Sequence, residues 1–484
     1  MSDAPAIIWF RHDLRVGDNP ALTAAMASQR PLILVYIYDD RTPGLRPLGG
    51  AQKWWLDKSL KSLTESVDAL GGRLTLARGA ALDVMTRLTA ETGASHVYWN
   101  RRYGGPERAL DSQIKASLKS AGVAVDSFNA NLLMEPWTLK TGQGGHFKVF
   151  SPMWRALQAA YDESAPLPAP SALKCATNTP SEDLKSWALH PTSPDWSEGI
   201  ADAWTVGENA ARQRLDAFLD TAVTGYGEGR NIPGALSTSR LSPHLRFGEI
   251  SPRQIWTATK LSVATGQANE KDAQKFLSEI AWREFSYHLL FHQPDLGAQN
   301  WKREFDALPW RDDPEGLKAW ETGQTGYPMV DAGMRELWTT GWMHNRVRMI
   351  VASFLTKHLL IDWRRGEDWF WDTLVDADLA NNAAGWQWTA GTGADAAPYF
   401  RVFNPFTQGE KFDADGAYVR QWVPELSKLP NSLIHRPWDA PADTLAAAGV
   451  TLGETYPHPI VEHSSARTRA LNAYETVKAH KSAA

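Results

Sequence analysis

Short apolar runs alternate with amphipathic stretches over roughly the first quarter of the chain. The runs are AIIWF, PLILVYIYD, RLTLARG, HVYWN and VAVDSFN, and segments such as AQKWWLDKSLKSLTESVDAL separate them. Alternation of strands and helices at this spacing is typical of a parallel sheet with helices on both faces. Residues 1–130 are therefore predicted to form an α/β domain with a Rossmann-like parallel sheet.

The pattern changes twice after this domain. Residues 131–200 contain PLPAPSALKCATNTP and HPTSPDW, which are rich in proline, serine and threonine and predict an interdomain connector. Residues 201–475 show helical apolar spacing almost throughout, as in RMIVASFLTKHLLIDW. The second half of the chain is therefore predicted to be a large all-α domain.

Composition narrows the class of protein. The 484 residues are 43% apolar and 22% charged, without a run of apolar residues long enough for a membrane span or a signal peptide, so we expect a cytoplasmic protein. The single cysteine, Cys175, excludes an internal disulfide and a multi-cysteine metal site, and we expect no metal. The net charge of -5 gives no sign of a nucleic-acid partner, although a local basic face can exist within a near-neutral total.

Tryptophan is unusually abundant, with 23 residues against 12 tyrosines and 16 phenylalanines. Most of these indoles are expected to serve packing. Trp386 and Trp388 in AGWQWTAG are different, because side chains two residues apart on a helix point in nearly opposite directions. If this segment is helical, the two rings contact two different neighbours.

Two stretches combine polar groups at helical spacing. In TSRLSPHLRFGEISP, the hydroxyls of Thr238, Ser239 and Ser242 precede a helical segment, where they can cradle a phosphate or simply cap the helix. In FLSEIAWREFSYHLL, Glu279 and Trp282 share one face with an arginine. That face can line a polar pocket with an aromatic wall, or it can be a solvated ion pair beside a core tryptophan.

Two further stretches carry amides and acids. In GWMHNRVRMIVASF, Asn345 and Met349 lie on one helical face, so pure packing is less favoured for this methionine. DADLANNAAGWQW places acidic and amide side chains ahead of the two indoles, which suits hydrogen bonding to a heterocycle or a sugar, or ordinary turn chemistry. The dinucleotide fingerprint G-x-G-x-x-G is absent after the first strand, so a nucleotide cofactor is expected elsewhere.

Long ordered runs of this sequence resemble the photolyase/cryptochrome family, and most closely its bacterial cyclobutane pyrimidine dimer (CPD) photolyases. The similarity covers nearly the whole chain and is carried by IIWFRHDLRVGDNPAL, YGEGRNIPGALSTSRLSPHL, WREFSYHLL, TGYPMVDAGMRELWTTGWMHNRVRMIVASFLTKHLLIDW and DADLANNAAGWQWTAGTGADAAPYFRVFNPFTQGEKFD.

The resemblance implies FAD bound in a U shape within the helical domain, with FADH⁻ as the working form. In this role Arg348 pairs with Asp376 near the isoalloxazine, Asp378 contacts the ribityl and ring region, and Asn382 faces flavin N5. The full implied set of FAD contacts is Tyr226, Thr238, Ser239, Leu241, Ser242, Glu279, Arg348, Asp376, Asp378 and Asn382.

Further roles are implied at matching positions. The lesion is contacted, and its repair assisted, by Glu279, Trp282, Asn345, Met349 and Trp388, together with Asn382. DNA is bound by Arg230, Trp282, Arg346, Met349, Trp388 and Arg401, which include three arginines for the phosphates. A chain of tryptophans, Trp386, Trp363 and Trp310, passes electrons from the surface to oxidised flavin.

The implied function is light-driven repair of cyclobutane dimers in UV-damaged DNA by a monomeric deoxyribodipyrimidine photo-lyase. Three alternatives remain: a cryptochrome-type blue-light receptor, a (6-4) photolyase, for which Met349 replaces an expected histidine, and a flavin oxidoreductase.

The implied antenna is 5,10-methenyltetrahydrofolate, or alternatively 8-hydroxy-5-deazaflavin or FMN. Glu107 and Glu135 are candidate antenna contacts, and each can instead be an ordinary helix-start or loop carboxylate.

Overall fold

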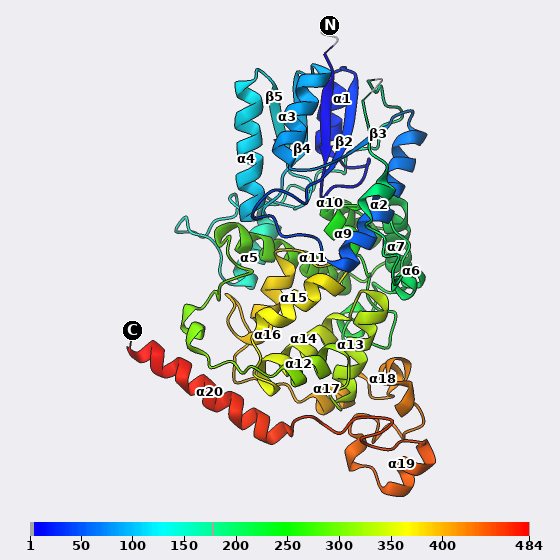
Figure 1. Ribbon diagram of the computed structural model, residues 1–484, viewed down its shortest axis with the longest axis vertical. Coiled ribbons are helices and arrows are strands. Elements are labelled where there is room, and N and C mark those ends of the chain that lie inside the picture. The colour runs from blue at the N-terminus through cyan, green and yellow to red at the C-terminus, as the bar shows by residue number, and fades with distance from the viewer. Residues whose placement is uncertain (1–3, 177–178, 484) are drawn as a thin grey trace.

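The N-terminal part of the chain forms the expected parallel sheet. The computed structural model describes residues 4–176 and 179–483. Its five strands are parallel and lie in the order β3-β2-β1-β4-β5 at one end of the molecule (Figure 1). The strands are β1 (Ala6–Phe10), β2 (Leu32–Tyr38), β3 (Leu74–Arg78), β4 (His96–Asn100) and β5 (Ala124–Phe128). Each of the five apolar runs therefore forms one strand, as predicted.

Helices cover both faces of this sheet. Alternate side chains of a strand point to opposite faces, so Ile8 and Phe10 enter one core while Ile7 and Trp9 enter another. The first core also contains residues of α1 (Pro20–Ala27) and α2 (Gly50–Ala69). The second contains residues of α3 (Ala81–Thr92) and α4 (Gly105–Ser120). The prediction of an α/β domain is confirmed.

The connecting stretch is mostly irregular but contains α5 (Phe150–Ala160), η1 (Leu184–Trp187) and α6 (Glu198–Ala203). Phe150, Met153 and Leu157 lie three and four residues apart, so they share one face of α5 and bury it in a core of the helical domain. That apolar spacing is short and is surrounded by loop composition, which explains why composition alone did not reveal the helix.

The second half of the chain is helical, as predicted, and it occupies the middle and the other end of the molecule (Figure 1). None of its described helices is both long and apolar enough to cross a membrane. The helices are α7 (Glu208–Thr221), α8 (Tyr226–Gly229), α9 (Ser242–Phe247), α10 (Pro252–Ala264), α11 (Glu270–His292), η2 (Arg303–Ala307), α12 (Pro314–Glu321), α13 (Pro328–Thr340), α14 (Asn345–Ser353), η3 (Phe354–His358), α15 (Trp363–Thr373), α16 (Asn381–Ala390), α17 (Pro405–Phe412), α18 (Ala417–Trp422), η4 (Pro424–Leu426), η5 (Pro437–Asp439), α19 (Ala442–Ala448) and α20 (His463–Ala483).

The start of α2 docks the α/β domain onto the end of α15. The indole Nε1 of Trp371 donates to the carbonyl O of Pro47 at 2.8 Å, and Gln52 Nε2 donates to the carbonyl O of Trp371 at 2.7 Å. A Cβ on Gly49 would collide with that same Trp371 carbonyl, so the close approach of the two backbones requires glycine. This contact fixes the position of the loop before α2 relative to α15.

Candidate functional site

One large cavity, of about 580 Å³, lies in the helical domain between α8, α9, α11, α14 and α16. Its volume is typical of cofactor sites, which measure about 300–1,000 Å³. The cavity brings together most of the site residues expected from the sequence: Tyr226, Arg230, Thr238, Ser239, Leu241, Ser242, Glu279, Trp282, Asn345, Arg346, Arg348, Met349, Asp376, Asp378, Asn382, Trp386 and Trp388. The other expected site residues lie outside its lining: Arg401, Trp310, Trp363, Glu107 and Glu135.

The hydroxyl residues before α9 do not act as helix caps. The residue at the N-cap of α9 is Leu241, and α9 has no side-chain capping hydrogen bond. The Ser242 hydroxyl instead accepts a hydrogen bond from the Trp342 indole at 3.2 Å. Thr238 and Ser239 line the cavity. Of the two interpretations of this stretch, the phosphate cradle therefore agrees better with the geometry.

An ion pair between the half-buried Arg348 and the buried Asp376 forms one wall. The Arg348 guanidinium donates to both carboxylate oxygens of Asp376, at 3.1 and 2.8 Å. Asp378 accepts at Oδ1 from the backbone N–H groups of Ala380 and Asn381, at 2.8 and 2.6 Å, and so satisfies free donors at the start of α16. Both acids are less than one-tenth exposed. The wall therefore presents fixed charges and few flexible groups.

Asn382 contacts a second ion pair behind the cavity. Its Nδ2 donates to the carboxylate Oε1 of Glu367 at 2.7 Å and to the backbone O of Glu367 at 2.9 Å. The same carboxylate accepts two hydrogen bonds from Arg46, at 2.7 and 2.8 Å. Burial raises the pKa of Glu367, and Arg46 opposes that rise. No pattern in the sequence singles out Arg46 or Glu367, which lie 321 residues apart.

The α11 face is also polar and aromatic, as predicted. Glu279 forms ion pairs with Arg230 at 2.5 Å and with Lys275 at 2.9 Å. Trp282 is partly buried and stacks on Phe150 of α5, with ring centroids 3.8 Å apart and an angle of 8° between the planes. One face of this indole is therefore covered by α5, and the residue still lines the cavity.

The two indoles of α16 have different surroundings. Trp386 is 2% exposed and packs against Phe370 at 5.0 Å and Trp320 at 6.0 Å between ring centroids. Its ring lies against the backbone of Gly366, where a Cβ would collide with it. Trp388 is partly exposed and lies outside that apolar core, although both residues line the cavity. The predicted divergence of the two rings is confirmed.

The other tryptophans of the expected electron chain lie within and beside the same core. Trp363 is fully buried in the core that contains Trp386, and its indole donates to Asn300 Oδ1 at 2.8 Å. Trp310 is partly buried and packs against this core. The series thus runs from two buried indoles to a partly exposed one, which is the order that the expected role requires; the role itself stays a prediction.

Two of the arginines expected to bind DNA line the cavity, Arg230 and Arg346, whereas Arg401 is exposed and lies outside the lining. Burial lowers the pKa of Arg346, and the positive charges of Arg230 and Arg401 lower it further. The Arg346 guanidinium lies over the Phe412 ring at 4.3 Å. Positive charges therefore act on one another here despite the net charge of -5, although Arg230 is also paired with Glu279.

Arg240 is a lining residue that the sequence did not single out for a role. It adopts a positive φ of 50°, and its guanidinium lies against the rings of both Trp204 and Trp342, 4.5 and 4.8 Å from their centroids. Burial lowers its pKa. No local pattern in the sequence places two tryptophans against it, because each comes from a distant segment.

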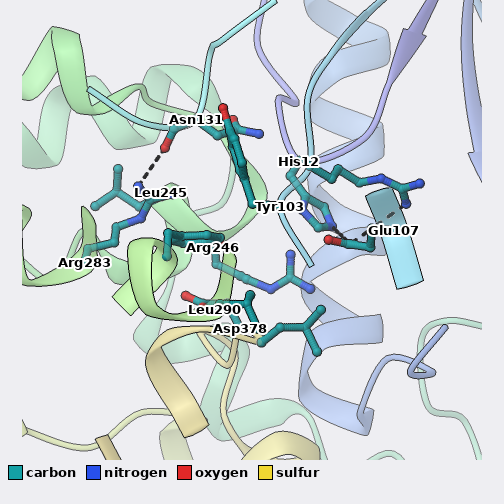
Figure 2. Close-up of a pocket in the computed structure, with 12 residues that line it drawn as sticks. His12, Tyr103, Glu107, Asn131, Leu245, Arg246, Arg283, Leu290 and Asp378 are labelled. Carbon is teal, nitrogen blue, oxygen red and sulfur yellow. Dashed lines mark hydrogen bonds and ion pairs between the residues drawn. The ribbon is translucent and has the colours of Figure 1, made fainter. Parts of the chain in front are cut away.

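A second, much smaller cavity lies at the carboxyl ends of β1 and β4, where the strand order reverses (Figure 2). Open α/β sheets usually bind ligands at such a point. Here the cavity has room of only about 20 Å³ for the centres of water molecules, which suffices for one water molecule. The α/β domain contributes His12, Tyr103 and Glu107, and the helical domain contributes Arg246, Arg283 and Asp378.

Ion pairs of the α/β domain fill the space beside this cavity. Asp111 accepts from Arg11 at 2.7 Å and from Arg102 at 2.6 Å. Burial lowers the pKa of His12 well below its ordinary value, and the positive charge of Arg246 lowers it further, so this imidazole is neutral near pH 7. The residues after β1 and β4 thus interact with one another and leave no space for a large ligand.

The two candidate antenna residues have different surroundings. Glu107 accepts from the backbone N–H of Gly104 at 3.1 Å and faces the small cavity, which cannot hold a folate. Glu135 accepts from Arg101 Nε at 2.7 Å, and the Arg101 guanidinium lies 5.8 Å from the ring of Trp137, which is 40% exposed. The antenna role of either residue stays a prediction.

The large cavity fits an FAD molecule in size and in chemistry. The Trp386 indole N–H is buried beside the cavity without a hydrogen-bond partner in the described protein. A buried donor without a partner is costly, and a ligand atom can satisfy it. Hydroxyl groups, a buried ion pair and the amide of Asn382 offer further partners for phosphate, ribityl and ring atoms.

Comparisons with known proteins agree with this geometry. Residues 6–171 match the family described as DNA photolyase, and residues 276–476 match the FAD binding domain of DNA photolyase. The chain is 55% identical to the deoxyribodipyrimidine photo-lyase of Agrobacterium fabrum over 99% of both proteins. It is 39% identical to cryptochrome-1 of Arabidopsis thaliana, over 96% of this chain and 69% of that protein. The crystal structure of a bacterial class III photolyase from Agrobacterium tumefaciens superposes with a TM-score of 0.96, at 55% identity over 99% of this chain and 98% of the other.

Proposed function

This chain belongs to the DNA photolyase family and contains its FAD-binding domain, and we propose that it is a deoxyribodipyrimidine photo-lyase. In this proposal it repairs cyclobutane pyrimidine dimers in UV-damaged DNA, driven by light. The observation that carries the proposal is that the lining of the large cavity includes both the expected FAD contacts and the expected lesion contacts. Two ligands in one cavity can lie close enough for electron transfer.

When bound, reduced FAD supplies a light-excited electron that splits the dimer and then returns, without net redox change. The chain's own residues bind and orient it. Thr238, Ser239 and Ser242 provide hydroxyl groups for the diphosphate and ribityl chain. Arg348 and Asp376 hold each other in a fixed geometry beside the ring system. These contacts restrict the ring to one position.

Trp282 and Trp388 form the aromatic part of the proposed lesion site. Indole faces stack on bases that have been pulled out of a duplex, and such contacts offset the cost of unstacking. Asn345 and Met349 lie on the same face of α14 and line the same cavity. Oε1 of Glu279 already accepts from Arg230 and Lys275, so we propose that the free Oε2 accepts a pyrimidine N–H.

Arg230, Arg346 and Arg401 are proposed to bind the phosphates that flank the lesion. The positive charges of Arg230 and Arg401 act on Arg346, which lines the cavity together with Arg230. Contacts of this kind position the duplex and make affinity depend on salt. Arg230 also pairs with Glu279, so DNA binding and lesion recognition share one side chain.

We propose three functional segments: residues 1–130 as the antenna-binding domain, 131–200 as the connector, and 201–475 as the FAD-binding and DNA-binding domain. For the antenna we propose 5,10-methenyltetrahydrofolate, with 8-hydroxy-5-deazaflavin or FMN as alternatives. Of the two glutamates, Glu135 is favoured, because its partner Arg101 lies beside the exposed indole of Trp137, which is suitable for stacking. The absorption spectrum of protein purified from its native host distinguishes these chromophores.

The proposed function is tested by incubating FAD-loaded, reduced protein with oligothymidylate that contains cyclobutane dimers. Under near-ultraviolet or blue light the absorbance of intact thymine should recover, and in the dark it should not. Absence of recovery in the light would contradict the proposal, whereas equal recovery in the dark would indicate a different reaction.

A cryptochrome-type blue-light receptor is the second candidate, and the similarity to cryptochrome-1 of Arabidopsis thaliana favours it. Against it stands the complete lesion set, with both tryptophans lining the cavity. A receptor would take up FAD and respond to light without restoring thymine in the same assay.

A further inference from the structure

A continuous series of contacts leads from the α/β domain to the wall of the large cavity. Arg46 lies in the loop between β2 and α2. It holds the carboxylate of Glu367 through two hydrogen bonds, at 2.7 and 2.8 Å. The same carboxylate accepts from Asn382 Nδ2 at 2.7 Å. The cavity wall is therefore connected to a residue of the other domain through a single buried carboxylate.

These contacts determine which end of the Asn382 amide faces the cavity. The two neighbours of its Nδ2 are a carboxylate oxygen and a backbone carbonyl oxygen, and neither has a proton to give. The NH₂ group must therefore face Glu367. The carbonyl Oδ1 has no hydrogen-bond partner within the part of the chain that the structure describes, and Asn382 lines the cavity. The side chain of Asn382 therefore presents a hydrogen-bond acceptor to the cavity and not a donor.

Glu367 depends on Arg46 for its charge. The Glu367 side chain is only 3% exposed, and a buried carboxylate without a counter-charge is strongly disfavoured. Arg46 is in turn fixed in place, because its guanidinium lies 4.1 Å from the ring of Trp371. The indole N–H of Trp371 also donates a hydrogen bond to the backbone O of Pro47, the residue after Arg46. The orientation of Asn382 therefore depends on how the α/β domain docks on α15.

We propose that Arg46 and Glu367 are positioning residues that favour the reduced form of bound FAD by holding the Asn382 carbonyl toward the flavin. The inference rests on the proposed function and on the placement that the family resemblance implies for Asn382, facing flavin N5. Reduced flavin carries a proton on N5 and oxidised flavin does not, so an acceptor at this place stabilises the reduced form. Docking of the α/β domain thereby contributes to the redox preference of a cofactor held in the helical domain.

The test is the midpoint potential of bound FAD in Arg46→Ala, measured by spectroelectrochemistry. Without Arg46, Glu367 loses its counter-charge and the amide can turn its NH₂ group toward the cavity. We expect the ratio of reduced to oxidised FAD at a fixed potential to fall about tenfold, the effect of one lost hydrogen bond. Oxidation of reduced FAD in air should accelerate in parallel.

Asp368→Asn is the matched control. Asp368 is 72% exposed and pairs with the same arginine at 2.7 Å, but it does not contact Asn382. This variant should keep the wild-type potential. If Arg46→Ala also keeps it, with FAD bound in full, the proposal is overturned.

Glu367→Asp is the second variant and decides the outcome if Arg46→Ala fails to retain FAD. Its shorter side chain keeps a charge for Arg46 but cannot maintain both contacts, so the potential should fall as well; an unchanged potential overturns the proposal. Repair of dimers by the wild-type protein distinguishes failure of the positioning role from failure of the proposed function. A wild-type protein that repairs dimers while these variants keep its potential contradicts only the positioning role, whereas a wild-type protein without repair contradicts the proposed function.

Discussion

Two cavities of this molecule lie in plausible places for a ring-containing ligand, yet only the larger of them offers space for one. The large cavity in the helical domain measures about 580 Å³, whereas the cavity at the carboxyl ends of β1 and β4 measures about 20 Å³. The second lies where open α/β sheets usually bind nucleotides. Asp111 with its two arginines fills that region, and Arg246 of the helical domain closes it. The difference shows that a fold supplies a location, while side chains decide whether it becomes a site.

The largest expected effect lies within the large cavity, where Trp386→Phe should abolish photoreduction of oxidised FAD. Phenylalanine keeps most of the packing against Phe370 but is much harder to oxidise than an indole. Flavin absorbance during illumination measures the loss. Repair by chemically reduced protein should persist, and equal loss of both activities would contradict separate roles for the two faces of α16.

Arg348→Ala should lower FAD affinity by about a hundredfold. It removes an expected contact to FAD, and a hydrogen bond that involves a charged group contributes up to about 3 kcal/mol. The FAD content of purified protein measures the effect. Arg335→Ala is the control, because Arg335 forms a similar ion pair with Glu425, at 2.8 Å, away from the cavity. If both variants lose FAD equally, the effect is a general loss of stability.

Trp388→Ala should weaken binding to dimer-containing DNA by about 10- to 100-fold, since a stacked base contributes about 1–3 kcal/mol. The FAD content should not change. Fluorescence anisotropy with a labelled oligonucleotide measures the affinity. Trp338→Ala provides the control, because Trp338 is 62% exposed and stacks on Trp369 at 6.0 Å outside the cavity. If the control variant loses as much DNA affinity, a specific role of Trp388 is contradicted.

The smallest effect is expected at the small cavity, for His12→Gln. Burial keeps His12 neutral in the folded protein, but in the unfolded chain it takes up a proton as the pH falls below 6.5. Because protonation stabilises the unfolded chain, the free energy of unfolding of the wild type decreases as the pH falls. The variant should lose less stability, by at most about 1.4 kcal/mol per pH unit between pH 6.5 and the lowered pKa of His12 in the folded protein.

Urea unfolding at neutral pH and at about pH 5.5 measures this difference, and FAD content should be unaffected. An identical pH dependence in variant and wild type would mean that His12 is protonated in the folded protein. Loss of FAD from the variant would instead connect the small cavity to the large one and break the contrast between them.

The sequence by itself determined the local structure and the local neighbours. Alternation of apolar runs gave the five strands, and the spacing of Glu279 and Trp282 placed them on one helical face. The i, i+2 spacing of Trp386 and Trp388 gave their divergence. These features depend on neighbours within about four positions, so a pattern along the chain contains them.

Only the tertiary structure decided which distant groups meet. It joined Arg46 to Glu367 across 321 residues, and it brought Arg230 against Glu279. It also revealed α5, whose short apolar face is stabilised by packing rather than by its own propensity. Such contacts depend on how whole elements pack, and no spacing along the chain encodes them. For this reason the sequence indicated which chemistry to expect, and packing determined which cavity could hold it.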